Sequence, residues 1–340
     1  MMIQLFLDAL HCRNQSRTPI WLMRQAGRYI PEYRAIRQKH SFLEMCRQPE
    51  LAAEITSLPI RIFGMDAAIL FSDILVIPDA LGVGVHFKDG TGPIIERPLN
   101  GAGDVKALPK PNIREVLNYV GKAIRYVTPE LKVPLIGFCG GPFTVASYMV
   151  EGGSSRDFKK TKQWMFRDPV SFHELLSKIT EASIEYLRLQ IDSGVQAIQI
   201  FDSWANVLDY PSFRDFSLEY LRRMMLALVD SKIPVIIFCR GSSCFAKDIA
   251  EIHPNGISLD WNANLVKMRS IVPSHVALQG NLDPDVLYAS PEVIKREAER
   301  LLHGMVSDPG YIFNLGHGMK PDIPVDAVKT LIEAIKNFRL

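Results

Sequence analysis

The stretch AAILFSDI, residues 67–74, is an almost continuous apolar run that contains a single carboxylate. A strand buried on both faces has this composition, whereas a strand with one wet face alternates apolar and polar residues. Similar runs recur along the chain, and a shorter one, IWLMR, precedes it at 20–24. The later runs are PLIGFCGG (134–141), AIQIFDSW (197–204), VIIFCRG (235–241), GISLDW (256–261), VALQGN (276–281) and YIFNLGHG (311–318). The sequence therefore predicts eight buried strands.

Amphipathic segments of helical length separate these strands. One runs from 171 to 194 and ends at a C-cap glycine, Gly194. Another, at 212–231, begins on Ser212, and a third, at 290–304, begins on Ser290 and ends at Gly304. Alternating strands and helices predict a parallel sheet with right-handed crossovers. Eight such units in 340 residues indicate a (β/α)8 TIM-type barrel, with a doubly wound sheet as the alternative.

The domain organisation that we expect is one barrel spanning residues 1–340, with an N-terminal helical extension over about 1–17. The segment GVGVHFKDGTGPIIERP, 82–98, contains two short extended runs around Asp89-Gly90 and Gly92-Pro93, which is typical of a β-hairpin insertion. Such a hairpin could cover the barrel mouth or pack against another subunit. No glycine-rich GxGxxG turn follows the first strand, so a Rossmann dinucleotide site is not expected.

Composition and charge narrow the function classes. The chain is 47% hydrophobic with a formal net charge of +2, so nothing global indicates nucleic-acid binding. Its five cysteines form no CxxC pair, which suggests reduced thiols. The N-terminus lacks a basic signal-peptide region, and no run approaches the roughly 18 apolar residues of a membrane helix. We therefore expect a soluble cytoplasmic protein.

An arginine cluster marks the first candidate binding region. The stretch WLMRQAGRYIPEYRAIR, 21–37, carries four arginines, and Gly27 and Pro31 interrupt any long helix there. Arginine suits bidentate recognition of carboxylates and phosphates, so the cluster suggests a small polyanionic ligand. A solvated basic face is the alternative. The arginines are Arg24, Arg28, Arg34 and Arg37.

Asp73 is the most informative single residue. Barrel enzymes place their chemistry at the C-terminal ends of the strands, and Asp73 lies at such an end. A carboxylate in so apolar a run is costly unless it is paired or hydrogen-bonded. It is therefore either a structural partner of an arginine or a group that meets N–H donors or a developing cation on a ligand.

Three other strand ends carry polar candidates. Tyr148 follows the third strand, Ser203 the fourth and His317 the eighth. Each has a structural alternative: a core tyrosine, a helix-capping serine and a loop histidine bonded to backbone. No base is recognisable beside Ser203 or any cysteine, so a nucleophilic triad is not expected.

Six ordered motifs carry a specific resemblance over essentially the whole chain. They are RQAGRY (24–29), FSDIL (71–75), GGPFT with SYMVEG (140–152), FDSWA (201–205), LQGNLDP (278–284) and FNLGHG (313–318). In order and spacing they resemble the uroporphyrinogen decarboxylase family. The resemblance implies a homodimer without cofactor or metal that acts in haem biosynthesis. Its activity would be the conversion of uroporphyrinogen III to coproporphyrinogen III, with four acetate carboxyls lost as CO2.

The resemblance also implies residue roles. Asp73 matches the catalytic aspartate, and Arg24 and Arg28 match substrate-binding arginines, whereas Arg34 and Arg37 are expected outside the pocket. A carboxylate could accept the four converging pyrrole N–H groups and stabilise the protonated ring from which CO2 leaves. Arg24 and Tyr148 are both possible proton donors. The remaining substrate-binding positions are Gln25, Ala26, Gly27, Tyr148, Ser203 and His317.

Two departures from the family pattern and two other functions are also considered. Asn206 stands where glycine is usual, and FCRGSS, 238–243, is a variant of the fifth-strand end. Zinc-dependent corrinoid methyltransferases of the same fold use a His-x-Cys pair and a later Cys as ligands. Here these places read Phe238-Cys239-Arg240 and Leu315-Gly316-His317, which disfavours a thiolate-rich zinc site. A tetrapyrrole-binding protein without turnover is the third possibility, although Asp73 argues against it.

Overall fold

Seven parallel strands form one curled sheet in the computed structural model, which describes residues 4–88 and 92–339. The strand order is β1-β4-β5-β6-β7-β8-β9, and every neighbouring pair is parallel. The prediction of parallel strands is confirmed for seven of the eight segments, although β1 covers only two of the eight residues expected over 67–74. The strands are β1 (Ala68–Ile69), β4 (Leu135–Gly140), β5 (Ala197–Asp202), β6 (Val235–Cys239), β7 (Gly256–Ser258), β8 (Ala277–Leu282) and β9 (Tyr311–Leu315).

The segment expected as the first strand lies between β9 and β1, at the eighth position of the barrel. Ile20 forms a parallel bridge with Phe313, and on the other side the Asp66 N–H donates to the Ile20 carbonyl at 2.8 Å. The expectation of a full strand over 20–24 was wrong. Side chains take the place of ladder partners there: the Met23 N–H donates to Asn314 Oδ1 at 2.9 Å, and the Leu22 N–H donates to Gln25 Oε1 at 3.3 Å.

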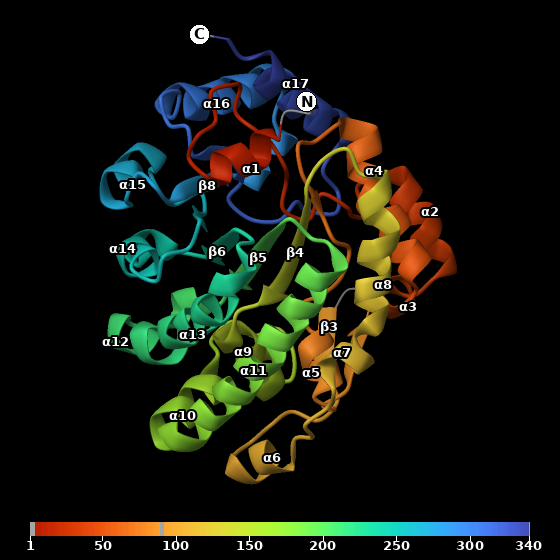
Figure 1. Ribbon diagram of the computed structural model, residues 1–340, viewed down its shortest axis with the longest axis vertical. Coiled ribbons are helices and arrows are strands. Elements are labelled where there is room, and N and C mark those ends of the chain that lie inside the picture. The colour runs from red at the N-terminus through yellow and green to blue at the C-terminus, as the bar shows by residue number, and fades with distance from the viewer. Residues whose placement is uncertain (1–3, 89–91, 340) are drawn as a thin grey trace.

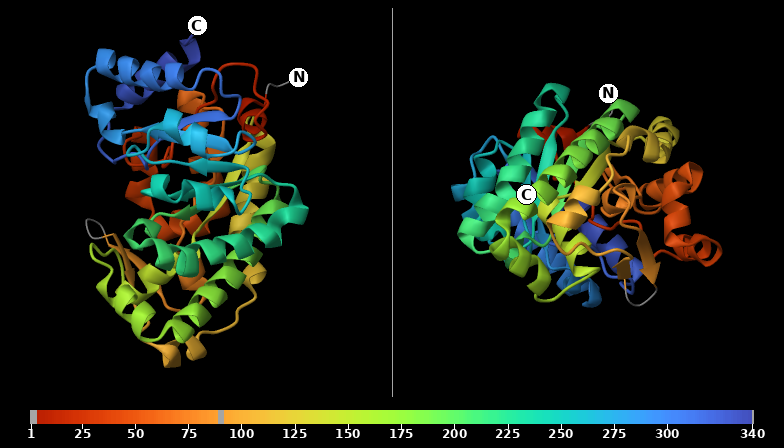
Figure 2. Two further views of the ribbon diagram at one scale, coloured as in Figure 1. Left: turned by 90° about the vertical axis from the view of Figure 1, so that its left-hand side faces the viewer. Right: turned by 90° about the horizontal axis from the view of Figure 1, so that it is seen from below.

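Helices surround the sheet (Figure 1), and Figure 2 shows the same arrangement from two further directions. The long α11 packs against α8, α9, α13 and β4, and α1 lies beside β9. The helices are α1 (Leu5–Leu10), α2 (Pro31–Lys39), α3 (Phe42–Arg47), α4 (Pro49–Phe63), α5 (Val76–Ala80), α6 (Ala102–Ala107), α7 (Ile113–Val116), α8 (Asn118–Val127), α9 (Pro142–Glu151), α10 (Lys159–Arg167), α11 (Pro169–Ser193), α12 (Tyr210–Phe213), α13 (Glu219–Leu228), α14 (Ala246–Ala250), α15 (Leu265–Ile271), α16 (Pro291–Gly304) and α17 (Val325–Asn337). None of them, within the described part of the chain, is long and apolar enough to span a bilayer.

The three helix predictions are confirmed in position, although α11 and α12 each begin two residues before the expected start. Gly194 ends α11 in the left-handed region, with φ 116°, and Ser290 precedes α16. The segment 212–231 is irregular: it comprises the end of α12, a π-helical turn η3 (Arg214–Leu218), α13 and a final 3-10 turn η4 (Val229–Ser231). The start expected at Ser212 was wrong because the Asp209 carboxylate accepts the Ser212 N–H at 3.0 Å, which caps a helix that begins at Tyr210.

The expected hairpin is present and is attached to the end of α9. Strand β2 (Val85–Lys88) pairs antiparallel with β3 (Gly92–Ile95), while Asp89 and Gly90 lie outside the described residues. The Ile95 N–H donates to the Gly152 carbonyl at 3.0 Å, and Ile94 bridges Gly153. A Cβ at Gly153 would lie 2.7 Å from the Pro93 carbonyl oxygen, so this close approach requires glycine.

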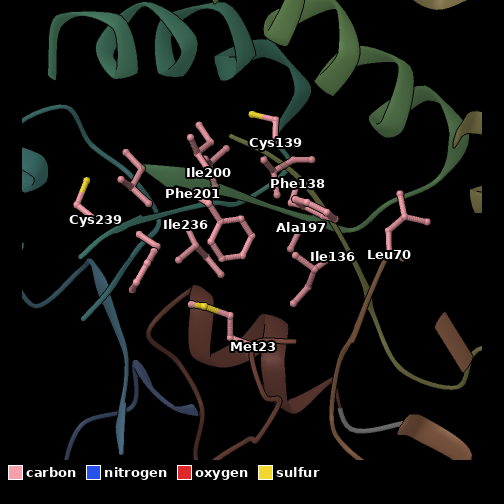
Figure 3. Close-up of a cluster of buried hydrophobic side chains, with 14 of the residues drawn as sticks. Met23, Leu70, Ile136, Phe138, Cys139, Ala197, Ile200, Phe201, Ile236 and Cys239 are labelled. Atoms are coloured by element: carbon pink, nitrogen blue, oxygen red, sulfur yellow. The ribbon is translucent and has the colours of Figure 1, made fainter. Parts of the chain in front are cut away.

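Large apolar side chains share the barrel interior with a buried polar layer, in which Gln279 bonds to Trp21, Gln199 and Ser258. Figure 3 shows Phe201 directed toward Met23, whereas Cys139 and Cys239 point away from it. Phe138 and Phe201 meet edge to face with ring centroids 5.7 Å apart. They are at most 9% exposed. This apolar layer fills the centre of the barrel and lies beneath the polar groups of the cavity.

Replacing Asp66 tests how the segment around Ile20 is attached to the barrel. Its carboxylate makes a bidentate pair with Arg17, at 2.6 and 2.8 Å, and accepts the Ile20 N–H at 2.9 Å. Asp66→Ala leaves Arg17 and a backbone N–H without their partner, so we expect the free energy of unfolding in urea to fall by about 2–4 kcal/mol. Asp326→Ala, which removes an exposed ion pair with Lys329, is the control and should change stability by less than about 0.5 kcal/mol. Equal stabilities of the two variants would contradict this account.

Candidate active site

A cavity of about 490 Å³ opens at the C-terminal ends of the strands, where barrel enzymes place their chemistry. All nine residues that the sequence analysis selected border it, so the structure brings together positions from five separate segments. They are Arg24, Gln25, Ala26, Gly27, Arg28, Asp73, Tyr148, Ser203 and His317.

Gln25 stabilises the turn that carries Arg24 and Arg28 from its buried side. This side chain is fully buried, and its Nε2 donates to the Ala67 carbonyl at 3.2 Å. The Tyr29 hydroxyl donates to the Gln25 carbonyl at 2.5 Å. Arg24 and Arg28, in contrast, have exposed side chains. Gln25 therefore shapes the turn, and the arginines on either side of it are available to a ligand.

Arg24 has an unusual backbone and a close neighbour. Its φ of 62° lies in the left-handed region, which is uncommon for a residue with a side chain. A Cβ at Gly318 would overlap the Arg24 side chain. The second glycine of the LGHG motif is thus required so that the Arg24 side chain can pass over it.

His317 is a neutral hydrogen-bond donor. The Gly318 N–H donates to Nδ1 at 2.8 Å, which leaves the ring proton on Nε2. Burial, helped by the positive charges of Arg24 and Arg240, lowers the pKa of His317 to about 4. The ring rests edge to face on Phe238, with 5.7 Å between centroids. At neutral pH this side chain offers an N–H group and no positive charge.

Asp73 borders the cavity and is otherwise enclosed by protein. Oδ1 accepts the Leu75 N–H at 2.8 Å. Desolvation raises the pKa of Asp73 from its ordinary 3.8 to about 6, although the Leu75 hydrogen bond and the charge of Arg24 oppose that rise. Within the described residues Asp73 makes no ion pair with an arginine, so the alternative of a simple structural pair does not describe it. Its second oxygen remains available to donors on a ligand.

Asp202 positions the two elements that carry Tyr148 and Ser203. It is fully buried and accepts hydrogen bonds from the Thr144 N–H at 3.0 Å, the Thr144 hydroxyl at 2.6 Å and the Ser217 hydroxyl at 2.5 Å. Thr144 lies in the first turn of α9, and its hydroxyl oxygen in turn accepts the Trp204 N–H at 3.0 Å. Asp202 therefore holds α9, which carries Tyr148, against the loop that carries Ser203.

Tyr148 and Ser203 present hydroxyl groups to the same space. The Tyr148 ring packs against Trp204 with centroids 6.2 Å apart. Burial raises the pKa of Tyr148, as does the nearby Asp73, so the phenol stays protonated and can donate. Ser203 does not cap the helical turn η2 (Ala205–Val207), because Trp204 occupies the cap position.

Two cationic residues at the cavity were missed. Arg37 and Lys320 both border it, so the expectation that Arg37 lies outside was wrong. Arg37 is one helical turn beyond Tyr33, another cavity residue, and this i, i+4 spacing in α2 was the available signal. Arg34 does lie apart, because its guanidinium donates to the carbonyls of Arg28 and Tyr29.

The charge balance of the cavity indicates its ligand class. Among the described residues, four cationic side chains, Arg24, Arg28, Arg37 and Lys320, border it together with one carboxylate, Asp73. Since the whole chain carries only +2, positive charge is concentrated here. Among residues 4–88 and 92–339, no group of three His, Cys, Asp or Glu side chains could hold a metal ion. The site is suited to a polyanion that also has N–H donors for Asp73.

Comparisons with known proteins identify the family of the chain. The profile of the family described as Uroporphyrinogen decarboxylase (URO-D) matches residues 1–338. A protein named uroporphyrinogen decarboxylase from Protochlamydia amoebophila is 56% identical over 98% of this chain and 91% of its own. Another of that name, from Alkalilimnicola ehrlichii, is 47% identical over 97% and 92%.

Solved structures share the fold at low identity. A methyltransferase from Methanosarcina mazei superposes with a TM-score of 0.82 over 98% of both chains at 22% identity, and this likeness concerns the fold alone. The match of almost the full length, with relatives at up to 56% identity, is decisive for the family. The chain belongs to the uroporphyrinogen decarboxylase family.

Proposed function

We propose that this chain converts uroporphyrinogen III to coproporphyrinogen III in haem biosynthesis, removing four acetate carboxyls as CO2 without a cofactor. The observation that carries the proposal is Asp73, a carboxylate in a cavity whose other described lining residues are cationic, neutral polar or apolar. Family membership and the names of relatives up to 56% identical support the same activity.

Substrate binding follows from charge and shape. The macrocycle has carboxylates around its edge and four pyrrole N–H groups at its centre. Arg24 and Arg28 bind edge carboxylates as bidentate donors. Asp73 accepts the central N–H groups with the oxygen that Leu75 leaves available. The Phe138 and Phe201 rings form an apolar floor at the cavity, against which pyrrole rings can pack.

The chemical step uses the substrate's own ring as the electron sink. A proton adds to the pyrrole carbon beside the acetate-bearing carbon, and the ring becomes cationic. The bond to the carboxylate then breaks, its electron pair neutralises the ring and CO2 leaves an exocyclic methylene. That methylene takes up a proton to become methyl, while the ring carbon gives its added proton back. Each arm thus consumes one proton and releases one CO2.

Asp73 lowers the barrier of this step by stabilising the cationic ring. Its negative charge lies in a desolvated site, where electrostatic stabilisation is stronger than in water. The neutral donors His317 and Tyr148 and the hydroxyl of Ser203 orient the substrate by hydrogen bonds that add no further charge. Gln25, Ala26 and Gly27 supply the wall between the two arginines.

The proposal extends to assembly and location. We propose a homodimer of single-domain barrels in the cytoplasm, on the strength of the family resemblance. The five cysteines are free thiols, which is consistent with a reducing compartment. Sedimentation equilibrium measures the mass of the assembly, and a species of one 38.3 kDa chain would contradict the dimer.

The activity is tested by anaerobic incubation with uroporphyrinogen III. Oxidation and chromatographic separation of the products by carboxyl number should show species with seven, six and five carboxyls, and finally four. Binding of the substrate without any loss of carboxyls would indicate a tetrapyrrole-binding protein instead. Stoichiometric zinc in the purified protein, together with no decarboxylation, would favour the methyltransferase alternative.

Asp73→Asn should bind substrate but lose most turnover. The amide still accepts the Leu75 N–H, but it no longer supplies the negative charge, so we expect kcat to fall by about 10²- to 10³-fold, as on loss of one oxyanion-hole donor. Single-turnover kinetics measure the decarboxylation step directly. Near-normal turnover would refute the assigned role of Asp73.

The same substitution should stabilise the protein at high pH. Since the pKa of Asp73 is raised from 3.8 to about 6, the folded state holds this proton more tightly than the unfolded chain does. The contribution of Asp73 to stability is therefore greatest below pH 4 and is lost as the pH rises through 6. Asp73→Asn should gain up to about 3 kcal/mol over the unmodified protein at pH 8 and nothing near pH 3. Urea unfolding at several pH values checks this, and a gain that does not depend on pH would contradict it.

Arg28→Ala should weaken binding more than stability. No ion pair holds Arg28 within the described residues, so its loss removes a ligand contact and leaves no buried charge unpaired. We expect KM to rise roughly tenfold with little change in the free energy of unfolding. Arg222→Ala, on the outer surface of α13, serves as the control and should leave KM unchanged. A fall in thermal stability without a change in KM would favour a structural role for Arg28.

A further inference from the structure

Lys320 is a cation at the cavity to which the mechanism above gives no role. It borders the cavity three residues after His317, and the Met319 N–H donates to the Met23 carbonyl at 3.0 Å. This hydrogen bond ties the loop of Lys320 to the segment that leads into the arginine turn. Lys320 and Arg24 therefore belong to one wall of the cavity.

The ammonium of Lys320 has a defined position at the cavity rim. It pairs with Asp285 in η6 (Pro284–Tyr288) and lies over the Tyr288 ring, 5.9 Å from its centroid. The Tyr288 hydroxyl in turn donates to Asp322 at 2.5 Å, which fixes the ring. The side chain of Lys320 is thus held at the rim by one carboxylate and one aromatic face.

The ion pair that holds Lys320 is easily exchanged. The two side chains are 51% and 56% exposed, and exposed pairs contribute little to stability because water competes for both charges. Lysine has a flexible stem and a compact charge, so its ammonium can move from one carboxylate to another without rearranging the backbone. A ligand carboxylate at the cavity edge can therefore replace Asp285 at small cost.

We propose that Lys320 determines specificity by binding a carboxylate at the edge of the tetrapyrrole, and that Asp285 retains the ammonium at the rim until that carboxylate replaces it. The inference rests on the proposed function, because it takes the ligand to be a macrocycle with carboxylates on its periphery. With Asp73 at the macrocycle centre, Lys320 and the arginines on adjoining segments would contact different arms. Lys320 then contributes to recognition of the substrate and has no part in bond breaking.

Steady-state kinetics with uroporphyrinogen III test the binding role. Lys320→Ala should raise KM about three- to fivefold with kcat within about twofold, and Lys320→Arg should restore most of the loss. Lys329→Ala is a closely matched control, because Lys329 also pairs with an aspartate and is 50% exposed but does not border the cavity. An unchanged KM for Lys320→Ala, or an equal rise for Lys329→Ala, would overturn the binding role.

A double-mutant cycle tests the exchange with Asp285. Asp285→Asn should lower KM about twofold, because the ammonium no longer has to leave an internal partner. In the Lys320→Ala background the same substitution should have no effect. An equal decrease in both backgrounds would mean that Asp285 acts only by general repulsion of the anionic ligand, and would overturn the exchange.

A binding measurement separates this inference from the proposed function. Uroporphyrin, the oxidised and fluorescent octacarboxylate, is titrated into the unmodified protein, Lys320→Ala and Lys329→Ala. If the unmodified protein does not decarboxylate uroporphyrinogen, the proposed activity fails, but a weaker Kd in Lys320→Ala alone would still support the site. If the unmodified protein turns over normally and all three bind alike, the inference alone fails.

Discussion

The site depends on how the chain is held between β9 and β1, where side chains replace the hydrogen bonds of a strand. Asn314 accepts the Met23 N–H, Gln25 accepts the Leu22 N–H, and Asp66 accepts the Ile20 N–H. A regular strand would have continued straight and placed Arg24 in an extended conformation. Because these side-chain bonds divert the backbone, the chain turns at the barrel mouth and both arginines face the cavity. Of the side chains that achieve this, Asn314 and Asp66 do not border the cavity.

Asp73 lowers the stability of the folded protein but favours its activity. Its enclosure raises the free energy of the charged folded state, as its pKa of about 6 shows. The same enclosure strengthens the attraction between its charge and a cationic ring. One backbone N–H and the field of Arg24 reduce the cost without neutralising the carboxylate. The protein therefore keeps a carboxylate that destabilises the empty site. A ligand with converging N–H donors offsets this cost by hydrogen-bonding to the carboxylate.

The sequence predicted the strands well because fully buried strands have a composition that surface segments lack. The observed β4 and β5 lie within the expected ranges to within two residues at either end. The prediction failed at 20–24 because the Met23 N–H bonds to the Asn314 side chain instead of to a neighbouring strand. Asn314 is 291 residues from Met23, so no nearby residue indicates this bond. The start of α12 failed for a local reason, since Asp209 caps the helix three residues before Ser212.

The candidate site was predicted as a set of positions, but the part each side chain plays needed three dimensions. Gln25 borders the cavity as expected, but its amide is buried within the turn, where it bonds to the Leu22 N–H and the Ala67 carbonyl. Lys320 follows no recognisable motif, and the only signal for Arg37 was its i, i+4 spacing from Tyr33; both border the cavity because α2 and the loop after β9 converge there. The tautomer of His317 determines which kind of inhibitor atom can bind beside it. With Nδ1 occupied by the Gly318 N–H and the ring uncharged, that side of the cavity calls for a neutral acceptor atom, and an anionic group belongs opposite the arginines.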